Sequence, residues 1–403
     1  MLTVDQARER VLGAVELCPQ VELDLEVAAG LVVAEDVRAP NALPRFDNSA
    51  MDGYAVRSDD VARATDDAPV GLHVVDESKA GSPAASKVEP GAAVRIMTGA
   101  QLPEGADGIV IVEDTTERGD EVTVRAPAGR HIRRAGEDLT QGAVAVTAGT
   151  ELDAGGLAML AACGVAGVRV HRRPRVALLV TGDELADAGV ELEPGQIRDS
   201  NSIAMRALSD EAGADVSFQR RVPDDLDEAL EMFKRASEEA DLVVSSGGVA
   251  AGRYDVVRDV VEKLGRIDLW RVAMQPGKPV VLGRLDEVPF LGLPGNPVSV
   301  HVSFEQFVRP AIRKMLGHRR LLRPRLFARL TQEVRKRPGR LHFVRVRLAW
   351  NGGELEATPT GPQGSHIQSS LVACDGVALF PIEAERLDVG AEVTVEVWSL
   401  PDR

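Results

Sequence analysis

The sequence has 403 residues, of which 44% are hydrophobic and 27% are charged, and its formal net charge at pH 7 is -15. A chain of this length is too long to fold around a single hydrophobic core, so we expect several domains of roughly 100 to 200 residues each. The negative charge argues against a general nucleic-acid binder, because non-specific affinity for a phosphate backbone comes largely from Lys and Arg.

The cysteines and the hydropathy pattern indicate a cytoplasmic protein. Cys18, Cys163 and Cys374 lie far apart and form no C-x-x-C motif, so neither a disulfide framework nor a zinc knuckle is indicated. No apolar run approaches the roughly 20 residues that a membrane span needs, and the N-terminus has no signal-peptide pattern. We therefore expect no membrane partner and no nucleic-acid partner.

The first part of the chain predicts one helix followed by a β-rich insertion. Residues 4–16 place apolar side chains at helical spacing, which predicts an amphipathic helix. From Pro40 to about Arg134, short β-like runs are separated by Gly, Pro and Asp. This texture predicts a small β-rich insertion that forms a lobe of its own.

From about Arg175 the pattern is typical of an α/β fold. Near-continuous β-branched runs alternate with amphipathic helices, which predicts a doubly wound core with a parallel sheet covered on both faces. A helix from about Pro297 to Leu316 closes this core. After Gly317 the chain alternates again between apolar runs and Gly-rich turns, and this tail predicts a small antiparallel β-domain.

Three loops rich in small polar residues follow predicted core strands. They are Thr181-Gly182-Asp183-Glu184, Ser245-Ser246-Gly247-Gly248 and Pro294-Gly295-Asn296-Pro297. In open α/β sheets ligands bind beyond the carboxyl ends of the strands, where backbone N–H groups and helix N-termini favour anions. The loops therefore predict a phosphate-bearing ligand. No Walker A or G-x-G-x-x-G motif is present, so P-loop hydrolysis and dinucleotide redox chemistry have no support.

Carboxylates are interleaved with these loops. They are Asp183, Glu184, Asp199, Asp224, Asp225 and Asp255. Carboxylates near phosphates are typical of a Mg²⁺ site, although Asp224 and Asp225 could equally be helix N-caps. Arg271 and Lys278 flank a Gly-Pro turn and would pair with an anionic ligand. No Ser-His-Asp or Cys-His arrangement is indicated, which argues against covalent catalysis.

An ordered set of short motifs spans nearly the whole chain. The motifs are FDNSAMDGYAV, VRIMTGA, GEDL, TGDEL, GQIRDSNS, SSGGVAAGRYD, PGKPVVLG, GLPGNPVSV and GPQGSHIQSS. Together they resemble the molybdopterin molybdenumtransferase family, which includes MoeA and the gephyrin E domain. The resemblance implies an enzyme that inserts molybdenum from molybdate into adenylylated molybdopterin and releases AMP with a divalent cation, Mg²⁺, present.

The resemblance also implies an architecture. It assigns residues 1–40 with 135–171 to an elongated N-terminal domain, 41–134 to an inserted lid, 172–318 to the molybdopterin-binding α/β domain and 319–403 to a β-barrel. It further implies a homodimer in which the lid of one subunit faces the α/β domain of the other, so that the active site forms between subunits. A molybdopterin adenylyltransferase is the implied upstream partner.

Site residues follow from the family motifs by position. The implied catalytic residues are Asp52, Asp138, Glu184, Asp224 and Asp255, and the first three of these are the implied metal ligands. The implied cofactor-binding residues are Thr98, Thr181, Gly182, Ser245, Ser246, Gly247, Gly248, Lys278, Pro294, Gly295, Asn296, Arg345 and Ser365. In FDNSAMDGYAV, Asp47 and Asp52 would lie near metal or molybdate; the alternative is a polar turn capped by its own side chains.

One departure from the family pattern and two rival functions remain. Gln275 stands where family members often have Lys, which removes one cation, although Lys278 is retained. A molybdopterin adenylyltransferase resembles residues 175–317 alone, so the predicted lid and barrel argue against that rival. A non-catalytic scaffold that binds a partner protein is the second rival, and no linker or receptor-binding segment supports it.

Overall fold

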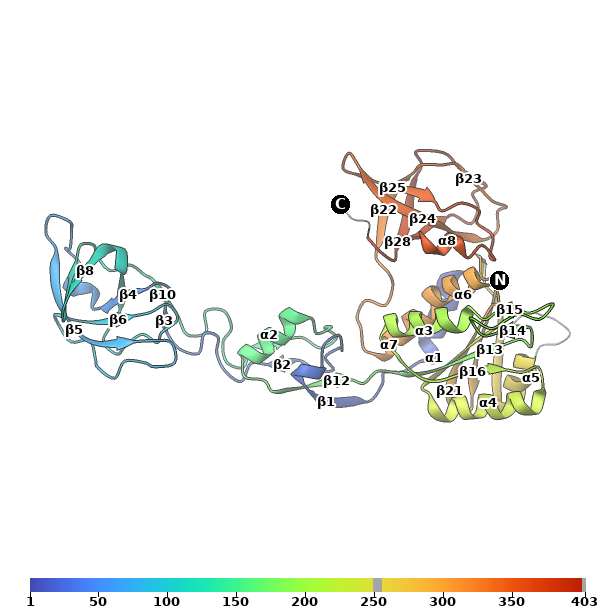
Figure 1. Cartoon of the computed structure of the whole chain (residues 1–403), viewed down its shortest axis with the longest axis horizontal. Coiled ribbons are helices and arrows are strands. Elements are labelled where there is room, and N and C mark those ends of the chain that lie inside the picture. Colours follow the sequence, from blue (N-terminus) through green and yellow to red (C-terminus); the bar gives the residue numbers. More distant parts are fainter. Residues whose placement is uncertain (249–255, 401–403) are drawn as a thin grey trace.

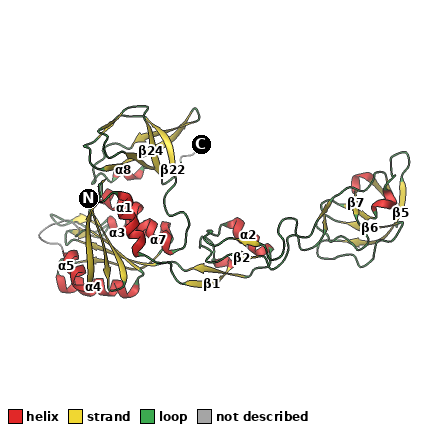
Figure 2. Cartoon of the chain, turned by 180° about the vertical axis from the view of Figure 1, so that it is seen from behind, coloured by secondary structure: helices red, strands yellow, loops and turns green. Residues whose placement is uncertain are grey.

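The computed structural model shows an elongated chain and describes residues 1–248 and 256–400. Figure 1 shows a β-rich lobe at one end, a small middle body, and an α/β core with a β-barrel beside it at the other end. Figure 2 shows the same separation from behind. Among the described helices, none is long and apolar enough to cross a membrane.

The α/β core contains a six-stranded sheet in the order β16-β13-β17-β21-β20-β18. The strands are β13 (Arg175–Thr181), β16 (Asp215–Val222), β17 (Leu242–Ser246), β18 (Gly265–Arg271), β20 (Pro279–Leu285) and β21 (Val288–Leu293). The expectation of a parallel sheet holds only for β16, β13, β17 and β21; β20 is antiparallel to both of its neighbours. The reason is the connection: only Asp286 and Glu287 join β20 to β21, whereas a parallel pair needs a crossover of about a dozen residues or more.

Helices cover both faces of this sheet. They are α3 (Asn201–Ala212), α4 (Leu226–Glu239), α5 (Val256–Leu264), α6 (Pro297–Ser303) and α7 (Arg309–Met315). Val176, Leu178 and Val180 of β13 are buried with α3, α6 and α7, whereas the alternate residues Ala177 and Leu179 are buried with α4 and α5. The two-residue period of the strand therefore supplies both apolar layers.

The predicted helix from Pro297 to Leu316 is interrupted. A π-helical segment, Phe304–Val308, separates α6 from α7. The N-terminal helix α1 (Val4–Ala14) packs on this segment, where Arg8 Nη2 donates to Gln306 Oε1 at 2.6 Å. This helix thus lies on the core, whereas the family resemblance groups residues 1–40 with the elongated domain.

The middle body joins two distant parts of the sequence. It contains β1 (Gln20–Asp24) paired with β12 (Gly167–His171), β2 (Val37–Arg38) paired with β11 (Val144–Val146), the 3-10 turn Leu25–Val27 and helix α2 (Ala154–Ala162). Its small core includes Leu31, Leu152 and Leu160. The chain passes through this body once on its way to the lobe and once on its return (Figure 1).

The lobe is a β-structure inserted between these two passes. Its six-stranded sheet has the order β7-β4-β6-β5-β9-β8, and a short pair lies at its base. The strands are β3 (Asn48–Ser49), β4 (Gly53–Val56), β5 (Val70–Ser78), β6 (Ala92–Ile96), β7 (Gly108–Ile111), β8 (Thr115–Arg118), β9 (Glu121–Val124) and β10 (Ile132–Arg133), with 3-10 turns at Ser58–Val61 and Val112–Asp114. The predicted β-rich insertion is confirmed.

The C-terminal part is a closed β-barrel, as predicted. Its strands are β22 (Arg325–Leu330), β24 (Leu341–Asn351), β25 (Glu354–Pro359), β26 (Gly376–Phe380) and β28 (Glu392–Val397), and the pairing of β24 with β26 closes the sheet. The smaller elements are β14 (Leu185–Ala186), β15 (Ile197–Arg198), β19 (Met274–Gln275), β23 (Val334–Arg335), β27 (Arg386–Leu387) and α8 (Ser369–Val372). Of these, β19 belongs to the core segment and pairs with β24, so the barrel is joined to the core by main-chain hydrogen bonds.

Candidate functional site

The three polar loops meet at the carboxyl ends of β13, β17 and β21. The backbone N of Gly247 donates at 3.1 Å to the carbonyl of Leu293, the last residue of β21, which joins the second loop to the strand end that leads into the third. Asn201, at the start of α3, donates from Nδ2 to Ser246 Oγ at 3.0 Å and to the Gly295 carbonyl at 2.7 Å. One amide therefore holds two of the loops together.

Glycine is required in the middle loop. Gly247 has a φ of 90°, a region that residues with a side chain rarely adopt. A Cβ at this position would lie 2.6 Å from Thr181 Oγ1 and 3.0 Å from the Thr181 carbonyl oxygen. The absence of a side chain thus lets the Ser246-Gly247-Gly248 backbone approach the first loop.

Two cavities lie on either side of the wall formed by Gly247, Gly248, Gly295 and Asn296. The first, of about 530 Å³, is the acidic cavity. Its other lining residues include Thr181, Gly182, Glu184, Arg198, Asp199, Asn201 and Asp224. The second, of about 610 Å³, is the basic cavity, and its other lining residues include Met274, Gln275, Lys278, Pro294, Arg340, Gln363 and Ser365.

Carboxylates in the acidic cavity lie close enough to repel one another. Burial raises the pKa of Asp224, and the negative charges of Asp183 and Glu184 raise it further. The backbone N of Asp224 also donates to Asp183 Oδ1 at 3.3 Å. A divalent cation would relieve this repulsion, and Mg²⁺ needs only one or two carboxylates besides phosphate oxygens and water. Glu184 and Asp224 therefore fit such an ion, although no cluster of three or more metal-binding side chains occurs among the described residues.

The next carboxylate has a different role. Asp225 is the N-cap of α4, and its Oδ1 accepts hydrogen bonds at 3.0 Å from the backbone N atoms of Asp227 and Glu228. The sequence left both Asp224 and Asp225 as either ligands or caps. The structure separates them, because only Asp224 lines the acidic cavity.

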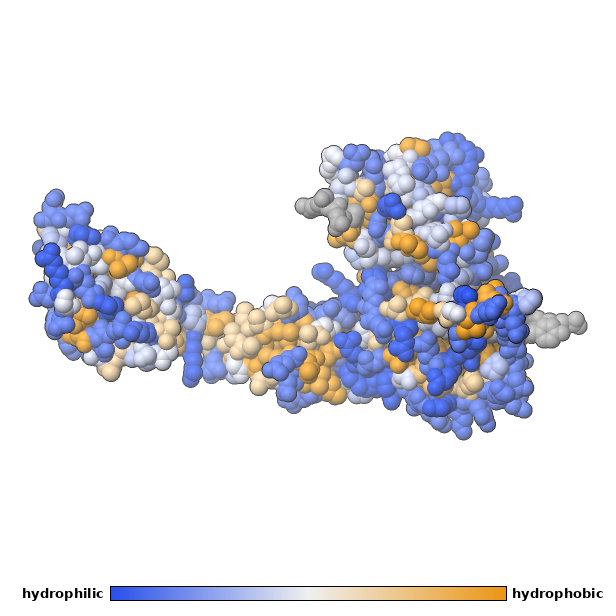
Figure 3. Space-filling view, viewed as in Figure 1, coloured by the Kyte–Doolittle hydropathy of each residue, from blue (hydrophilic) through white to orange (hydrophobic). Residues whose placement is uncertain are grey.

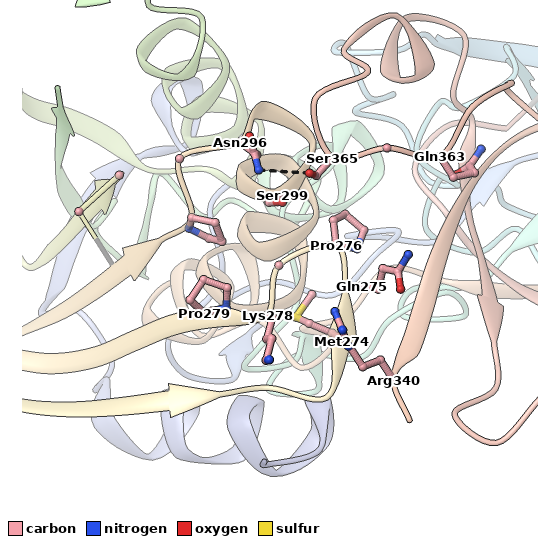
Figure 4. Close-up of a pocket in the computed structure, with 16 residues that line it drawn as sticks. Met274, Gln275, Pro276, Lys278, Pro279, Asn296, Ser299, Arg340, Gln363 and Ser365 are labelled. Atoms are coloured by element: carbon pink, nitrogen blue, oxygen red, sulfur yellow. Dashed lines mark hydrogen bonds between the residues drawn. The ribbon is translucent and has the colours of Figure 1, made fainter. Parts of the chain in front are cut away.

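The basic cavity lies between the core and the barrel (Figure 4). Lys278 and Asn296 come from the core, whereas Arg340, Gln363 and Ser365 come from the barrel. Asn296 Nδ2 donates to Ser365 Oγ at 3.2 Å, so the predicted third loop and the predicted GPQGSHIQSS motif are in direct contact. No carboxylate is among the described residues that line this cavity.

Two predicted binding residues of the core and the barrel, Ser245 and Arg345, line neither cavity. Ser245 is fully buried at the end of β17. Arg345 is also fully buried, and its guanidinium donates to Ser370 Oγ at 3.2 Å and to the Gly364 carbonyl at 3.3 Å. Arg345 is therefore an internal support of the loop that carries Ser365. Its neighbours Val344 and Val346 lie in the barrel core, so Arg345 faces the other side of β24, where α8 and this loop lie.

The predicted lid residues lie far from both cavities within one chain. Asp52 and Thr98 are exposed on the lobe, and the exposed Asp138 lies in the segment that joins the lobe to the middle body (Figure 1). Asp47 is bound internally: it accepts hydrogen bonds from the Ala135 backbone N at 2.8 Å and from Arg134 Nη1 at 2.6 Å. The stretch at residues 46–56 thus uses Asp47 as a structural carboxylate and presents Asp52 to the exterior. Asp255 lies outside the described residues.

Sequence reasoning missed two residues of the cavities. Asn201 is part of the quoted motif GQIRDSNS, but its link to two loops depends on tertiary structure. Arg340 follows the basic cluster at residues 335–337, which gives no local sign that one more arginine reaches the core. What brings Arg340 to the core is the pairing of the neighbouring strand β24 with β19, which is visible only in the folded structure.

Comparison with known families accounts for this arrangement. Three family models match: the MoeA N-terminal region (domain I and II) at residues 2–164, a probable molybdopterin binding domain at 177–314 and the MoeA C-terminal region (domain IV) at 328–398. The chain belongs to the molybdopterin molybdenumtransferase (MoeA) family.

Full-length relatives carry the same name. The chain is 39% identical to molybdopterin molybdenumtransferase from Haemophilus influenzae, with 99% of each chain covered. It is 39% identical to molybdopterin molybdenumtransferase 2 from Mycobacterium tuberculosis over 99% of this chain and 100% of that one. Among solved structures, the MoeA protein of Pyrococcus horikoshii has a TM-score of 0.86 at 32% identity and covers 98% of this chain and 99% of that one.

Proposed function

We propose that this protein inserts molybdenum from molybdate into adenylylated molybdopterin and releases AMP. The observation that carries the proposal is that an acidic and a basic cavity share the wall formed by Gly247, Gly248, Gly295 and Asn296. A phosphoanhydride bound across that wall would place its phosphates near the carboxylates and leave the basic cavity for an oxyanion. The full-length similarity to molybdenumtransferases supports this reading.

The residues of the site divide the work by charge. Glu184 and Asp224 would hold the divalent cation, proposed to be Mg²⁺, and the ion would neutralise charge on the phosphates as the anhydride is cleaved. Backbone N–H groups of the Gly247-Gly248 loop would hold phosphate oxygens. Lys278 would bind molybdate, which is itself an oxyanion, and Asn201 would keep two of the loops in register.

We propose that the complete active site forms in a homodimer. Asp52, Thr98 and Asp138 lie far from the cavities of their own chain (Figure 1), so a second subunit would have to supply them. The middle body offers the contact surface: α2 is apolar on all sides, yet Leu160 is its only buried residue. Figure 3 shows apolar surface concentrated over this body. Covering it with a second copy would remove that surface from water.

A separate reaction must supply the substrate, because the proposed chemistry consumes a molybdopterin already joined to AMP. We propose a molybdopterin adenylyltransferase as this upstream partner. The cytoplasmic location stays a prediction.

The test is AMP release from adenylylated molybdopterin by the purified chain, with and without molybdate and Mg²⁺. The proposal expects release that requires both. Tight binding of adenylylated molybdopterin without AMP release under any of these conditions would contradict it and indicate a scaffold that has kept the pocket and lost the chemistry.

A further inference from the structure

A third cavity, of about 730 Å³, runs along the free edge of the core sheet. Among the described strands β16 pairs only with β13, so no strand lies on its other side. Six consecutive residues of β16, 216–221, line the cavity, together with residues of α3 and α4, which cover opposite faces of the sheet (Figure 1). The cavity is therefore a groove with the strand edge as its floor and a helix on each side, and we call it the edge groove.

The edge groove gathers arginines in a chain whose formal net charge is -15. The arginines that line it are Arg206 of α3, Arg220 and Arg221 of β16, and Arg235 of α4. Arg221 pairs with Asp187, and Arg235 Nε lies 2.7 Å from Glu239 Oε1. Half of the arginines in the groove are therefore neutralised within the chain.

The other two, Arg206 and Arg220, form no ion pair with any described residue. Both donate to uncharged groups of Gln219, Arg206 Nε to the side-chain Oε1 at 2.8 Å and Arg220 Nη1 to the main-chain carbonyl at 2.7 Å. The remaining carboxylate of the groove, Asp199, accepts a hydrogen bond from the Ser202 backbone N at 2.9 Å. Two positive charges are thus left for an anionic occupant.

The two unpaired cations lie on opposite sides of the strand, because successive side chains of a strand point to opposite faces. On the α3 side, Gln219 accepts from Arg206 and donates from Nε2 to the Ser202 carbonyl at 3.3 Å. On the α4 side, Phe218 is buried, and the guanidinium carbon of Arg220 lies 5.3 Å from its ring centroid. A strand added at this edge would alternate in the same way, so acidic side chains on both of its faces would meet a cation.

Charged side chains on an edge strand also serve to prevent edge-to-edge association. Protection of that kind needs only the strand's own residues, as with the exposed Arg118 on β8, the edge strand of the lobe. In the edge groove the arginines come from a strand and two helices and surround a hollow. The edge groove also adjoins the acidic cavity, because Asp199 lines both, so an occupant would lie next to the candidate site.

We propose that the edge groove is the docking site for an extended acidic segment of a partner protein, which pairs with β16 as an additional strand. Main-chain hydrogen bonds to the free strand edge would supply the affinity, and Arg206 and Arg220 would select acidic side chains. Docking there is independent of the reaction assigned to the acidic and basic cavities, since neither arginine lines them.

The experiment is fluorescence anisotropy of a labelled peptide, Glu-Glu-Val repeated three times, titrated with the purified full chain. Arg206→Glu combined with Arg220→Glu is expected to weaken peptide binding about tenfold or more, because like charges then face each other. Arg63→Glu combined with Arg118→Glu is the matched control, because it changes the net charge equally at exposed positions of the lobe and should bind as the wild type does. Thermal unfolding of each variant shows that its fold is kept.

Main-chain pairing is tested by hydrogen–deuterium exchange and by a second peptide. The Glu-Glu-Val peptide should slow the exchange of those amides of β16 that do not bond to β13. A peptide with Pro in place of each Val should bind several-fold more weakly, since Pro has no N–H to donate.

Equal peptide affinity of the Arg206 and Arg220 double variant and the wild type would overturn the inference, as would binding that leaves the exchange of β16 unchanged. A wild type that binds no acidic peptide would also overturn it, including the case in which a second copy of the chain covers the edge groove.

Discussion

The carboxylate of Asp52 accepts two hydrogen bonds from Thr98, one from the backbone N at 2.7 Å and one from the hydroxyl at 2.8 Å. These two bonds, the backbone one first, lower the pKa of Asp52 below its usual range. The pair lies exposed on the lobe. The geometry keeps Asp52 ionised and oriented outward, as a group that acts on a partner subunit would need to be.

Removing the hydroxyl should change the pH dependence of AMP release. Thr98→Val deletes one hydrogen bond to the ionised carboxylate, so the pKa of Asp52 should rise toward its ordinary value. We expect the ionised carboxylate of Asp52 to be the active form, so the acid limb of the pH–rate profile should shift to higher pH, with little change near pH 8. An unshifted acid limb would show that Asp52 does not control the rate.

Neighbouring carboxylates should give opposite phenotypes. Asp224→Ala removes a side chain of the acidic cavity and should reduce AMP release by on the order of 100-fold with unchanged thermal stability. Asp225→Ala removes the N-cap of α4 and should cost about 1 kcal/mol of unfolding free energy with nearly normal AMP release. Chemical denaturation and turnover of both variants check this, and the same phenotype in both would contradict the assignment.

The loop glycine can be tested with a matched control. Gly247→Ala combines a positive φ with a Cβ only 2.6 Å from Thr181 Oγ1, so the loop must move and affinity for adenylylated molybdopterin should fall at least several-fold. Gly189→Ala has a similar φ of 86°, but nothing lies within 4 Å of its Cβ. It should share the cost of backbone strain, about 1 kcal/mol, and keep the affinity. Equal affinities would remove the loop from the binding site.

Much of this fold could be predicted from local pattern, since alternating strands and helices and the small polar loops are features of neighbouring residues. The reversed strand β20, which is antiparallel to both β18 and β21, could not be told from the parallel strands, because a buried strand has the same residue pattern in both orientations. The separate roles of Asp224 and Asp225 could not be predicted from the sequence either, since either side chain could cap α4. The position of Arg340 in the cavity is harder still to predict, because it depends on a strand pairing between residues 274–275 and 341–342 that are far apart in the sequence.

The junction of the middle body and the core should determine acid stability. Burial alone would raise the pKa of Asp241, but hydrogen bonds from Arg172 and Arg175 outweigh it and lower the pKa to about 2. Because the folded pKa lies below the ordinary one, the stabilisation is fully present above about pH 4 and is lost as the pH falls toward 2.

Asp241→Asn should therefore lower the unfolding free energy at pH 7 by about 1 to 2 kcal/mol, after allowance for solvent screening, and the difference from wild type should narrow below pH 4. Urea unfolding between pH 2 and pH 7 measures this. Glu191→Gln, at an exposed carboxylate, is the control and should show no such trend.

Mixed dimers offer a direct test of a site shared between subunits. Asp52→Ala alters the lobe and Asp224→Ala alters the core, and each homodimer should be nearly inactive. In a heterodimer of the two, one site combines both substitutions while the other combines an intact lobe with an intact core. Half of randomly assorted dimers are heterodimers with one active site of two, so co-expression should restore about one quarter of the wild-type rate.

The matched control for the mixed dimers combines Glu184→Ala with Asp224→Ala. Both side chains line the acidic cavity of the same subunit, so every heterodimeric site contains one damaged core and no activity should return. Recovery in the first mixture and none in the second is the pattern that only a site formed across the two-fold axis produces. Failure of both mixtures, with heterodimers demonstrated by differential tagging, would mean that lobe and core residues of one chain act together, which would require the elongated chain to fold back on itself.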